Sequence, residues 1–501
     1  MAQQIGIIDL GSNTARMIVM QYQPYHSFKL IDELKENVRL AHDLGADNLL
    51  RPAPMARAIH TLKMYSALGK ALNLPQIVAV ATSAVRDAAN QASFLAQVKE
   101  ETGLDLRVLS GEEEAYYGYL GVINSLPLRD GLIFDIGGGS VELAQVRGRG
   151  LVNSASLPLG TVRLTEQFLA GGGKADIKAL ERHLEAELGK IDWLGLQGKM
   201  QLVGVGGTVR NLAKIDQRAA KYPIDKVHGY ELPAARIDEW TARFAKMSPA
   251  EREAVDGLNS DRADVLLGGL VLIRALMRRS GAQSLWVSGE GLREGLFYEQ
   301  FLIGSTPPLV SNLRAFAAEN LARNYHYHVV HADKVRDLCL SMFDQLAALH
   351  GYGAWERELL EAAATLHDIG VSVNYYDHHK HGLYLIMNSA MPGFSHREIA
   401  IIALLARYHR KGATGDEGMG GVLQEGDLAR VARLSALLRI CEYLERSKSQ
   451  VVQGISCAVE KNEVRARIHA LGDATVEIWD ANRKTNLFRK AYGLPIVIEP
   501  A

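Results

Sequence analysis

The sequence has no excess of charge of either sign, few cysteines and no long apolar run. Its 501 residues include 56 Lys and Arg against 57 Asp and Glu, a formal net charge of −1. This balance excludes a diffuse basic surface that would bind nucleic acid through charge alone, so we expect no nucleic-acid partner. The apolar share of 48% is that of an ordinary globular protein, which excludes disorder. At ~150 residues per domain, the length predicts three or four domains.

The three cysteines, Cys339, Cys441 and Cys457, form no CxxC motif and no even-numbered framework. They are typical of thiols in a reducing compartment. The longest apolar stretch, Val265–Ile273, is far shorter than the ~18 residues that a membrane span needs. The opening MAQQ lacks the basic stretch of a signal peptide. The sequence therefore predicts a cytoplasmic protein with no membrane partner.

The first 300 residues alternate strand and helix patterns and contain an internal repeat. Asp9 and Asp135 each end an apolar run, and a glycine-containing turn and a second apolar run follow (IIDLGSNTARMIV and LIFDIGGGSVELA). A duplicated strand–turn–strand with helices between predicts two α/β domains, at 1–120 and 121–305. The segment GSTPPLVSN at 304–312 is the best linker candidate.

Beyond this linker, helical periodicity predicts an all-α domain at 306–446. The runs CAVEKNEVRARIHA, ATVEIWDA and LPIVIE predict a small strand-rich α+β domain at 447–501. Ten of the 16 histidines lie between His326 and His409. The chain therefore carries two regions of different chemistry.

Three glycine-rich turns carry the clearest chemical information. Two of them are the repeat turns described above. The third lies in VGVGGTVRNLA, where a strand enters a Gly-Gly-Thr turn and a helix follows. Glycine lets successive backbone N–H groups face one point, and a helix N-terminus adds partial positive charge, so such turns can hold phosphate. One such turn alone is more often a plain hairpin, but the repetition favours phosphate binding. The predicted phosphate-binding residues of the turns are Gly11, Ser12, Asn13, Thr14, Gly137, Gly138, Gly139, Ser140, Gly206, Gly207 and Thr208.

The residues around these turns favour direct attack by water. Asp9 and Asp135, at strand ends, are placed to hold Mg²⁺ or its waters beside a phosphate. No GxSxG motif occurs and no cysteine lies in the turns, so a covalent phosphoenzyme has no obvious carrier. The turns match neither a Walker loop nor a Rossmann motif. They resemble the actin/Hsp70/sugar-kinase superfamily, whose two RNase-H-like domains each offer a phosphate hairpin.

Motifs in a fixed order narrow this resemblance. DLGSNTARMIV, ATSAVRDAAN, VLSGEEEAYYGYLGV, FDIGGGSVEL, SLPLGTVRL, VGVGGTVRNLA, DRADVLLGG and SGEGLREGL follow one another between residues 5 and 300. Together they resemble the exopolyphosphatase/guanosine pentaphosphate phosphohydrolase (Ppx/GppA) family, in its long form with a C-terminal HD-like domain. The resemblance implies hydrolysis of a terminal phosphoanhydride, with Mg²⁺ or Mn²⁺ as cofactor.

The resemblance also implies two catalytic residues. The family's SG-x-EEA pattern places its catalytic glutamate at Glu114, which would orient and deprotonate the attacking water. Arg86 corresponds to a phosphate-binding arginine, whose planar guanidinium suits phosphate better than lysine does. The structural alternative for Glu114, as for Glu112 and Glu113, is an acidic first helical turn.

Further positions correspond to substrate and metal contacts in the family. Arg16 and Arg262 correspond to arginines that contact anionic groups of the substrate. Asp135 and Glu142 correspond to acidic metal positions, and Asp9 completes the predicted metal ligands. Glu142 is equally compatible with a solvent-facing strand position, and each arginine with a surface salt bridge.

The histidine-rich part resembles HD-superfamily metal phosphohydrolases in its H…HD…D pattern. His331 and the pair His367-Asp368 match, but Glu442 stands where the pattern has Asp. The resemblance implies a second metal site on these four residues, and imidazole with carboxylate suits Mn, Fe, Ni or Zn. The alternative is a helical scaffold without chemistry of its own. In two-metal members of that superfamily, extra ligands come from the interval that here contains His381, His396 and His409. The run DHHKHG is equally typical of a solvated loop, and of its histidines only His381 is expected to ligate.

Two substrates fit the resemblance. Inorganic polyphosphate is favoured, because a long anionic chain needs an extended groove and the protein is long. Guanosine pentaphosphate is the alternative and would add a pocket for the base; one enzyme could act on both. A third alternative is a member that binds a phosphorylated ligand without turnover. A homodimer is expected only because it is the commonest soluble oligomer.

Overall fold

The computed structural model describes residues 2–41, 47–169, 176–195 and 200–501. The chain forms two compact units, Met1–Ser311 and Asn312–Ala501. The division lies in the segment predicted as a linker. The four predicted domain ranges are finer than this division and stay a prediction, and the predicted boundary at residue 120 lies inside a helix.

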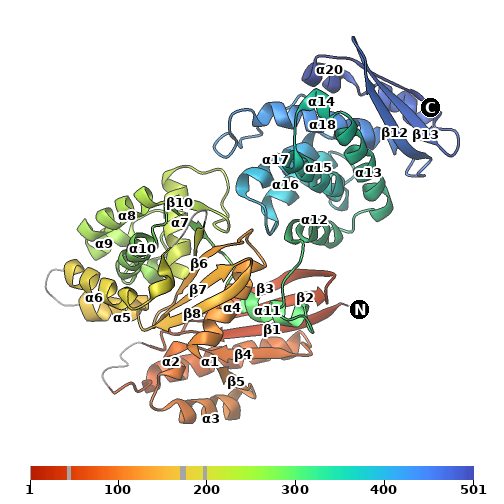
Figure 1. The fold of residues 1–501 in the computed structure, drawn as a ribbon. Coiled ribbons are helices and arrows are strands. Elements are labelled where there is room, and N and C mark those ends of the chain that lie inside the picture. The colour runs from red at the N-terminus through yellow and green to blue at the C-terminus, as the bar shows by residue number, and fades with distance from the viewer. Residues whose placement is uncertain (1, 42–46, 170–175, 196–199) are drawn as a thin grey trace. The chain divides into compact units, whose positions relative to one another are not determined.

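The first sheet of the N-terminal unit has the order β3-β2-β1-β4-β5 (Figure 1). Its first three strands form an antiparallel meander, and the last two run parallel to β1. The strands are β1 (Gln3–Leu10), β2 (Thr14–Gln23), β3 (Ser27–Asn37), β4 (Ile77–Ala81) and β5 (Leu106–Val108).

The second sheet repeats this plan, with the order β10-β11-β9-β6-β7-β8. Here β6, β7 and β8 form the antiparallel meander, and β9 and β11 run parallel to β6. The strands are β6 (Gly131–Ile136), β7 (Val141–Arg147), β8 (Gly150–Leu157), β9 (Gln201–Val205), β10 (Glu231–Pro233) and β11 (Ser284–Val287). The two corresponding sheets confirm the α/β class and the predicted duplication.

Helices bury the apolar faces of both sheets. Ile59 and Leu62 of α1 and Phe94 of α3 pack in the core of the first sheet. Leu212 of α7 and Trp240 of α8 belong to the core of the second. The helices of this unit are α1 (Pro52–Ala71), α2 (Ser83–Arg86), α3 (Gln91–Thr102), α4 (Gly111–Ile123), α5 (Thr161–Phe168), α6 (Ile177–Gly189), α7 (Gly207–Ala219), α8 (Ala234–Lys246), α9 (Pro249–Glu253), α10 (Leu266–Ser280) and α11 (Leu292–Phe301).

Helices α4 and α11 approach closely because glycines lie at their contact. A Cβ on Gly121 would collide with the backbone of Gly291, and one on Gly295 would collide with the carbonyl of Tyr117. Side chains of any size at these positions would force the helices apart. The close contact matters for the site, because α4 carries Glu114.

The second unit begins with helices and ends with a three-stranded sheet of order β12-β13-β14 (Figure 1). This agrees with the predicted all-α segment followed by a small α+β segment. The helices are α12 (Leu313–Asn324), α13 (Val329–Gln345), α14 (Ala347–His350), α15 (Ala354–Leu366), α16 (His378–Asn388), α17 (His396–Tyr408), α18 (Asp427–Leu444), α19 (Thr475–Asn482) and α20 (Asn486–Tyr492). The strands are β12 (Val452–Val459), β13 (Val464–Ala470) and β14 (Ile496–Pro500). Among the described residues, no helix is long and apolar enough to cross a membrane.

One segment of this C-terminal part differs from its prediction. The run ATVEIWDA forms helix α19 rather than a strand. Val476 and Ile478 alternate with polar residues as they would in a strand. However, the carboxylate of Asp473 accepts a hydrogen bond from the backbone N–H of Thr475 at 2.9 Å. Such a local side-chain bond turns the chain and favours the start of a helix.

Candidate functional site

Sheet register places the predicted metal residues on shared faces. Asp135 lies directly opposite Glu142 across the β6–β7 hairpin, and Asp9 lies opposite Arg16 across the β1–β2 hairpin. Directly opposed residues of an antiparallel pair project to the same face. The two corresponding hairpins therefore present equivalent acidic positions.

The turns of both sheets line one cavity of about 130 Å³. Ser12 of the first turn lies against Gly138 of the second, where a Cβ would be 3.0 Å from the Ser12 Cβ. Ser12 and Ser83 also approach each other, with their hydroxyl oxygens 3.0 Å apart. The predicted residues that line the cavity are Asp9, Gly11, Ser12, Asn13, Thr14, Arg16, Glu114, Asp135, Gly137, Gly138, Ser140, Glu142, Gly206, Gly207 and Arg262.

Three predicted residues lie beside the cavity rather than on its wall. Gly139 packs against Ser83, and Thr208 is buried with no hydrogen-bond partner for its hydroxyl. Arg86 forms an ion pair with the carboxylate of Glu114, and its Nη1 donates to the carbonyl of Leu109 at 3.2 Å. In this structure Arg86 therefore holds Glu114 and does not face the cavity.

Local structure explains why Glu114 turns inward while its neighbours do not. Ser110 and Glu113 form a capping box at the start of α4: the Ser110 hydroxyl accepts from the Glu113 N–H at 3.1 Å, and the Glu113 carboxylate accepts from the Ser110 N–H at 2.8 Å. Glu113 thus serves the helix end, and Glu112 is exposed. Glu114 is only 7% exposed and lines the cavity.

Burial dominates the electrostatics of the carboxylates. It raises the pKa of Asp135 to about 6 and that of Glu142 to about 7, with the charge of Asp135 adding to the effect on Glu142. Burial also raises the pKa of Glu114 well above its usual value; the charge of Glu142 adds to this and Arg86 opposes it. Burial and the mutual repulsion of the carboxylates therefore outweigh the opposing charges of Arg86 and Arg210 at these positions.

The donor set fits a hard divalent cation. Asp9, Asp135 and Glu142 offer carboxylate oxygens, and Oδ1 of Asp9 is buried without a hydrogen-bond partner. Carboxylate oxygens are the ligands that Mg²⁺ prefers, and Mg²⁺ usually keeps several of its waters. Among the residues that the structure describes, the ligand atoms of these three carboxylates do not all lie within 4.8 Å of one another.

The cavity also contains two arginines beyond those predicted from the sequence. Arg210 and Arg293 line it together with the predicted arginines. Burial lowers the pKa of Arg210 to about 10, and its Nη1 donates to the carbonyl of Gly289 at 3.2 Å. Arg293 donates to the carboxylate of Glu33 at 2.9 Å. Both lie within the motifs VGVGGTVRNLA and SGEGLREGL, which could have indicated them.

Glycine is required beside one of the predicted arginines. A Cβ on Gly207 would overlap the guanidinium of Arg262. The neighbouring Gly206 has a φ of +100°, which a residue with a side chain rarely adopts. These glycines thus let the third turn lie directly against Arg262.

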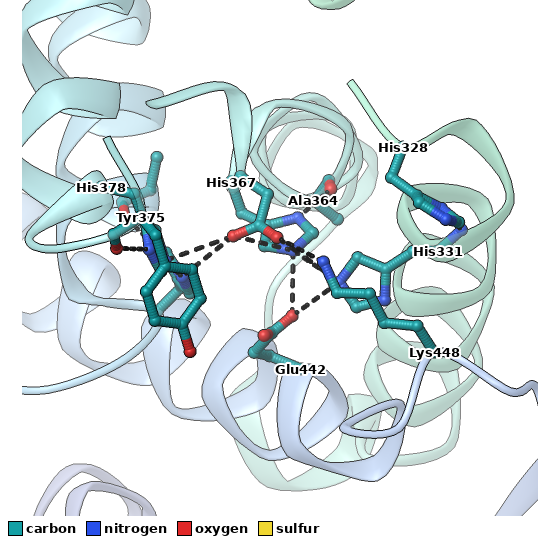
Figure 2. A network of polar contacts seen from close by, with 11 residues as sticks. His328, His331, Ala364, His367, Tyr375, His378, Glu442 and Lys448 are labelled. Carbon is teal, nitrogen blue, oxygen red and sulfur yellow. Dashed lines mark hydrogen bonds and ion pairs between the residues drawn. The ribbon is translucent and has the colours of Figure 1, made fainter. Parts of the chain in front are cut away.

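The second unit brings the other predicted residues together (Figure 2). His331, His367, Asp368 and Glu442 each offer one ligand atom, and these atoms lie within 4.8 Å of one another. Oε2 of Glu442 is 3.1 Å from Nε2 of His331 and 2.9 Å from Nε2 of His367. The glutamate therefore reaches the position where the sequence pattern has aspartate.

A second group in this cluster corrects the prediction for the further histidines. It consists of Asp368, His378 and His409. His378 is included because α16 begins at it, directly after Asp377, whose φ is +56°; its Nδ1 bonds the carbonyl of Tyr375. Among the described residues, the groups that could hold a metal do not include His381 or His396.

Known proteins match both units. The Ppx/GppA phosphatase family matches residues 18–303, and domain III of Ppx/GppA phosphatases matches residues 313–478. A family member from Aquifex aeolicus has 31% identity and a TM-score of 0.53, over 60% of this chain and 98% of that one. An exopolyphosphatase from Cytophaga hutchinsonii has 25% identity and a TM-score of 0.55, over 60% of this chain and 98% of its own.

These matches agree with the paired sheets and the shared cavity. The first unit has the predicted fold of two RNase-H-like domains of the actin/Hsp70 superfamily. Because the first family match alone covers more than half of the chain, the protein belongs to the Ppx/GppA phosphatase family.

Proposed function

We propose that this protein is an exopolyphosphatase that hydrolyses the terminal phosphoanhydride of inorganic polyphosphate. The observation that carries the proposal is the cavity in which glycine turns from two sheets surround the buried Glu114. Backbone N–H groups of such turns bind phosphate, and a buried carboxylate of raised pKa suits a general base.

In this mechanism Glu114 orients a water molecule and accepts its proton as the water attacks the terminal phosphorus. The phosphate is held by the turn amides and by the hydroxyls of Ser12 and Ser140. Arginines stabilise charge that develops on the transferring group, and those that line the cavity are Arg16, Arg210, Arg262 and Arg293. Arg86 is a positioning residue that holds the Glu114 carboxylate.

A divalent cation, Mg²⁺ or Mn²⁺, completes the proposal. Asp9, Asp135 and Glu142 would hold it, directly or through its waters. When bound, it supplies positive charge beside the phosphate. It would also offset the mutual repulsion of the buried carboxylates.

Two observations favour polyphosphate over guanosine pentaphosphate. Among the described residues, the cavity lining contains no aromatic side chain on which a guanine base could stack. In addition, α7 continues from the cavity as a basic face. Arg210, Lys214 and Arg218 are spaced by four residues and line an adjacent groove of about 670 Å³, to which Arg210 is common. Such a face suits the remaining phosphates of a long chain.

The substitution Lys214→Ala is expected to raise KM for long polyphosphate about fivefold, the effect of losing an exposed ionic contact of ~1 kcal/mol. It should leave KM for tripolyphosphate unchanged, because a short substrate does not reach this residue. Steady-state phosphate release on both substrates measures the difference. Lys246→Ala, on α8, is the matched control. An equal effect on both chain lengths would contradict a groove for the long chain.

The preferred substrate is tested by measuring phosphate release from long polyphosphate and from guanosine pentaphosphate. The two substrates are compared by their kcat/KM values. We expect the higher value for polyphosphate. A strong preference for the nucleotide would instead assign the alternative substrate, and binding of either without turnover would assign a phosphate-binding protein. The homodimer and the cytoplasmic location remain predictions from the sequence.

A further inference from the structure

The edge strand of the first sheet places two like charges side by side next to the cavity. Lys35 of β3 lies directly opposite Arg16 of β2 in the antiparallel register. Side chains of directly opposed residues project to the same face of the sheet, and two like charges at such positions repel each other. Arg16 lines the cavity. Lys35 therefore lies on the cavity side of β3, beside an arginine whose charge disfavours it.

The neighbours of Lys35 on this face of β3 are fixed to other walls of the site. Residues two positions away along a strand share its face. On one side, the carboxylate of Glu33 accepts a hydrogen bond from Arg293 of α11 at 2.9 Å. On the other side, the side-chain amide of Asn37 donates to the carboxylate of Asp261 at 2.6 Å. These contacts hold the strand in place on both sides of Lys35.

The charge of Lys35 itself is not balanced by a carboxylate. Among the described residues, no acidic side chain lies within 4.0 Å of its ammonium group. Burial is the largest of the effects that lower the pKa of Lys35. The charges of Arg16, Arg262 and Arg210 lower this pKa further, whereas that of Asp261 opposes them. Positive charges gathered in this way disfavour one another unless an anion binds between them.

The position of Lys35 indicates which part of a substrate it meets. The glycine turns and Glu114 line the cavity, and Lys35 is not among the described residues of that lining. Arg210, whose charge acts on Lys35, is common to the cavity and to the groove along α7. A phosphate chain whose terminal phosphate lies in the cavity would therefore meet Lys35 with its next phosphate.

We propose that Lys35, together with Arg16, binds the phosphate next to the terminal one. The ammonium group offers three donors to phosphate oxygens. When water attacks the terminal phosphorus, the bond from that phosphorus to the bridging oxygen breaks, and the bridging oxygen keeps the electron pair. Lys35 then offsets negative charge that develops on the leaving phosphate. The proposal rests on the proposed function in that the cavity holds the terminal phosphate, but it applies equally to polyphosphate and to guanosine pentaphosphate.

Calorimetric titration of the full-length protein with two anions in the presence of Mg²⁺ tests the proposal. Imidodiphosphate has two phosphate groups joined by a nitrogen that resists hydrolysis, and orthophosphate has one. Lys35→Ala is expected to bind imidodiphosphate about tenfold more weakly, the loss of one charge-assisted contact. Its affinity for orthophosphate should not change, because a single phosphate occupies only the turns. Lys35→Arg should restore most of the affinity for imidodiphosphate.

Lys29→Ala is the matched control, because this exposed lysine lies near the other end of β3. It should bind both anions like the wild type. The ligand-free protein gives a second readout. Lys35→Ala should have the same Tm as the wild type or a higher one, since it removes the repulsion with Arg16.

Three results for Lys35→Ala would overturn this proposal alone. These are an unchanged affinity for imidodiphosphate, an equal loss of affinity for both anions, and a lower Tm without ligand, which would assign Lys35 to the stability of the fold. Wild-type protein that binds neither anion would contradict the proposed function as well. No turnover is needed, so the outcome does not depend on which of the two substrates is hydrolysed faster.

Discussion

Glu114→Gln is expected to lower kcat on polyphosphate by about 10²- to 10⁴-fold, the usual contribution of a positioned general base. Glutamine keeps the size and the hydrogen-bonding oxygen of the side chain but cannot accept a proton from water. KM should change little, because the turns and arginines that bind phosphate remain in place. Initial rates of phosphate release at saturating substrate measure the effect.

Glu113→Gln is the matched control for this experiment. Residue 113 lies next to Glu114 on the same helical turn, and its carboxylate caps α4. Glutamine also serves in a capping box, so this variant should keep nearly the full rate. If Glu114→Gln keeps the wild-type rate, a different group activates the water and the proposed mechanism is wrong.

Arg86→Ala is expected to cost about 2 to 4 kcal/mol of transition-state stabilisation, measured as the ratio of kcat/KM values. Two effects contribute. The alanine removes a guanidinium beside the site, and it leaves the buried Glu114 carboxylate without its ion-pair partner. Without that partner, burial raises the pKa of Glu114 further, and less of the carboxylate is ionised at neutral pH.

Arg86→Lys separates these contributions. Lysine restores a positive charge near Glu114 but lacks the guanidinium that contacts both Glu114 and the Leu109 carbonyl. It should recover part of the loss. Arg163→Ala, which removes a partly exposed ion pair with Asp87, serves as the control and should act almost like the wild type. A loss below tenfold for Arg86→Ala would show that Arg86 is peripheral to the reaction.

The sequence predicts the fold of the first unit well because its repeat is visible in local patterns. An Asp at a strand end, a glycine turn and a second strand recur, and the two sheets share their strand order. The turn residues were predictable for the same reason. Gly139 and Thr208 lie beside the cavity, since a turn's pattern does not show which of its residues face inward.

Residues that reach the sites through tertiary packing were harder to predict. Arg210 and Arg293 lie on helices α7 and α11, and although both stand within motifs of the resemblance, only the packing of these helices shows that they line the cavity. His378 stands beside other histidines in DHHKHG, and the sequence does not show that it is the one at the start of α16 whose Nε2 lies beside Asp368. The strand predicted over ATVEIWDA is wrong: the Asp473 carboxylate accepts hydrogen bonds from the backbone N–H and the hydroxyl of Thr475, and this local turn outweighs a short alternating pattern.

The most direct test of the proposed function is ³¹P NMR of long polyphosphate during turnover by the wild-type enzyme with Mg²⁺. Attack at the terminal phosphorus predicts that the orthophosphate signal grows while the signal of internal phosphates falls. The signal of chain-end phosphates should not rise, because removal of a terminal phosphate creates no new chain. It also predicts that Glu114→Gln slows this growth without changing the products. A rise in the signal of chain-end phosphates, which internal cleavage would cause, or no orthophosphate at all, would contradict the proposal that this cavity removes terminal phosphate from polyphosphate.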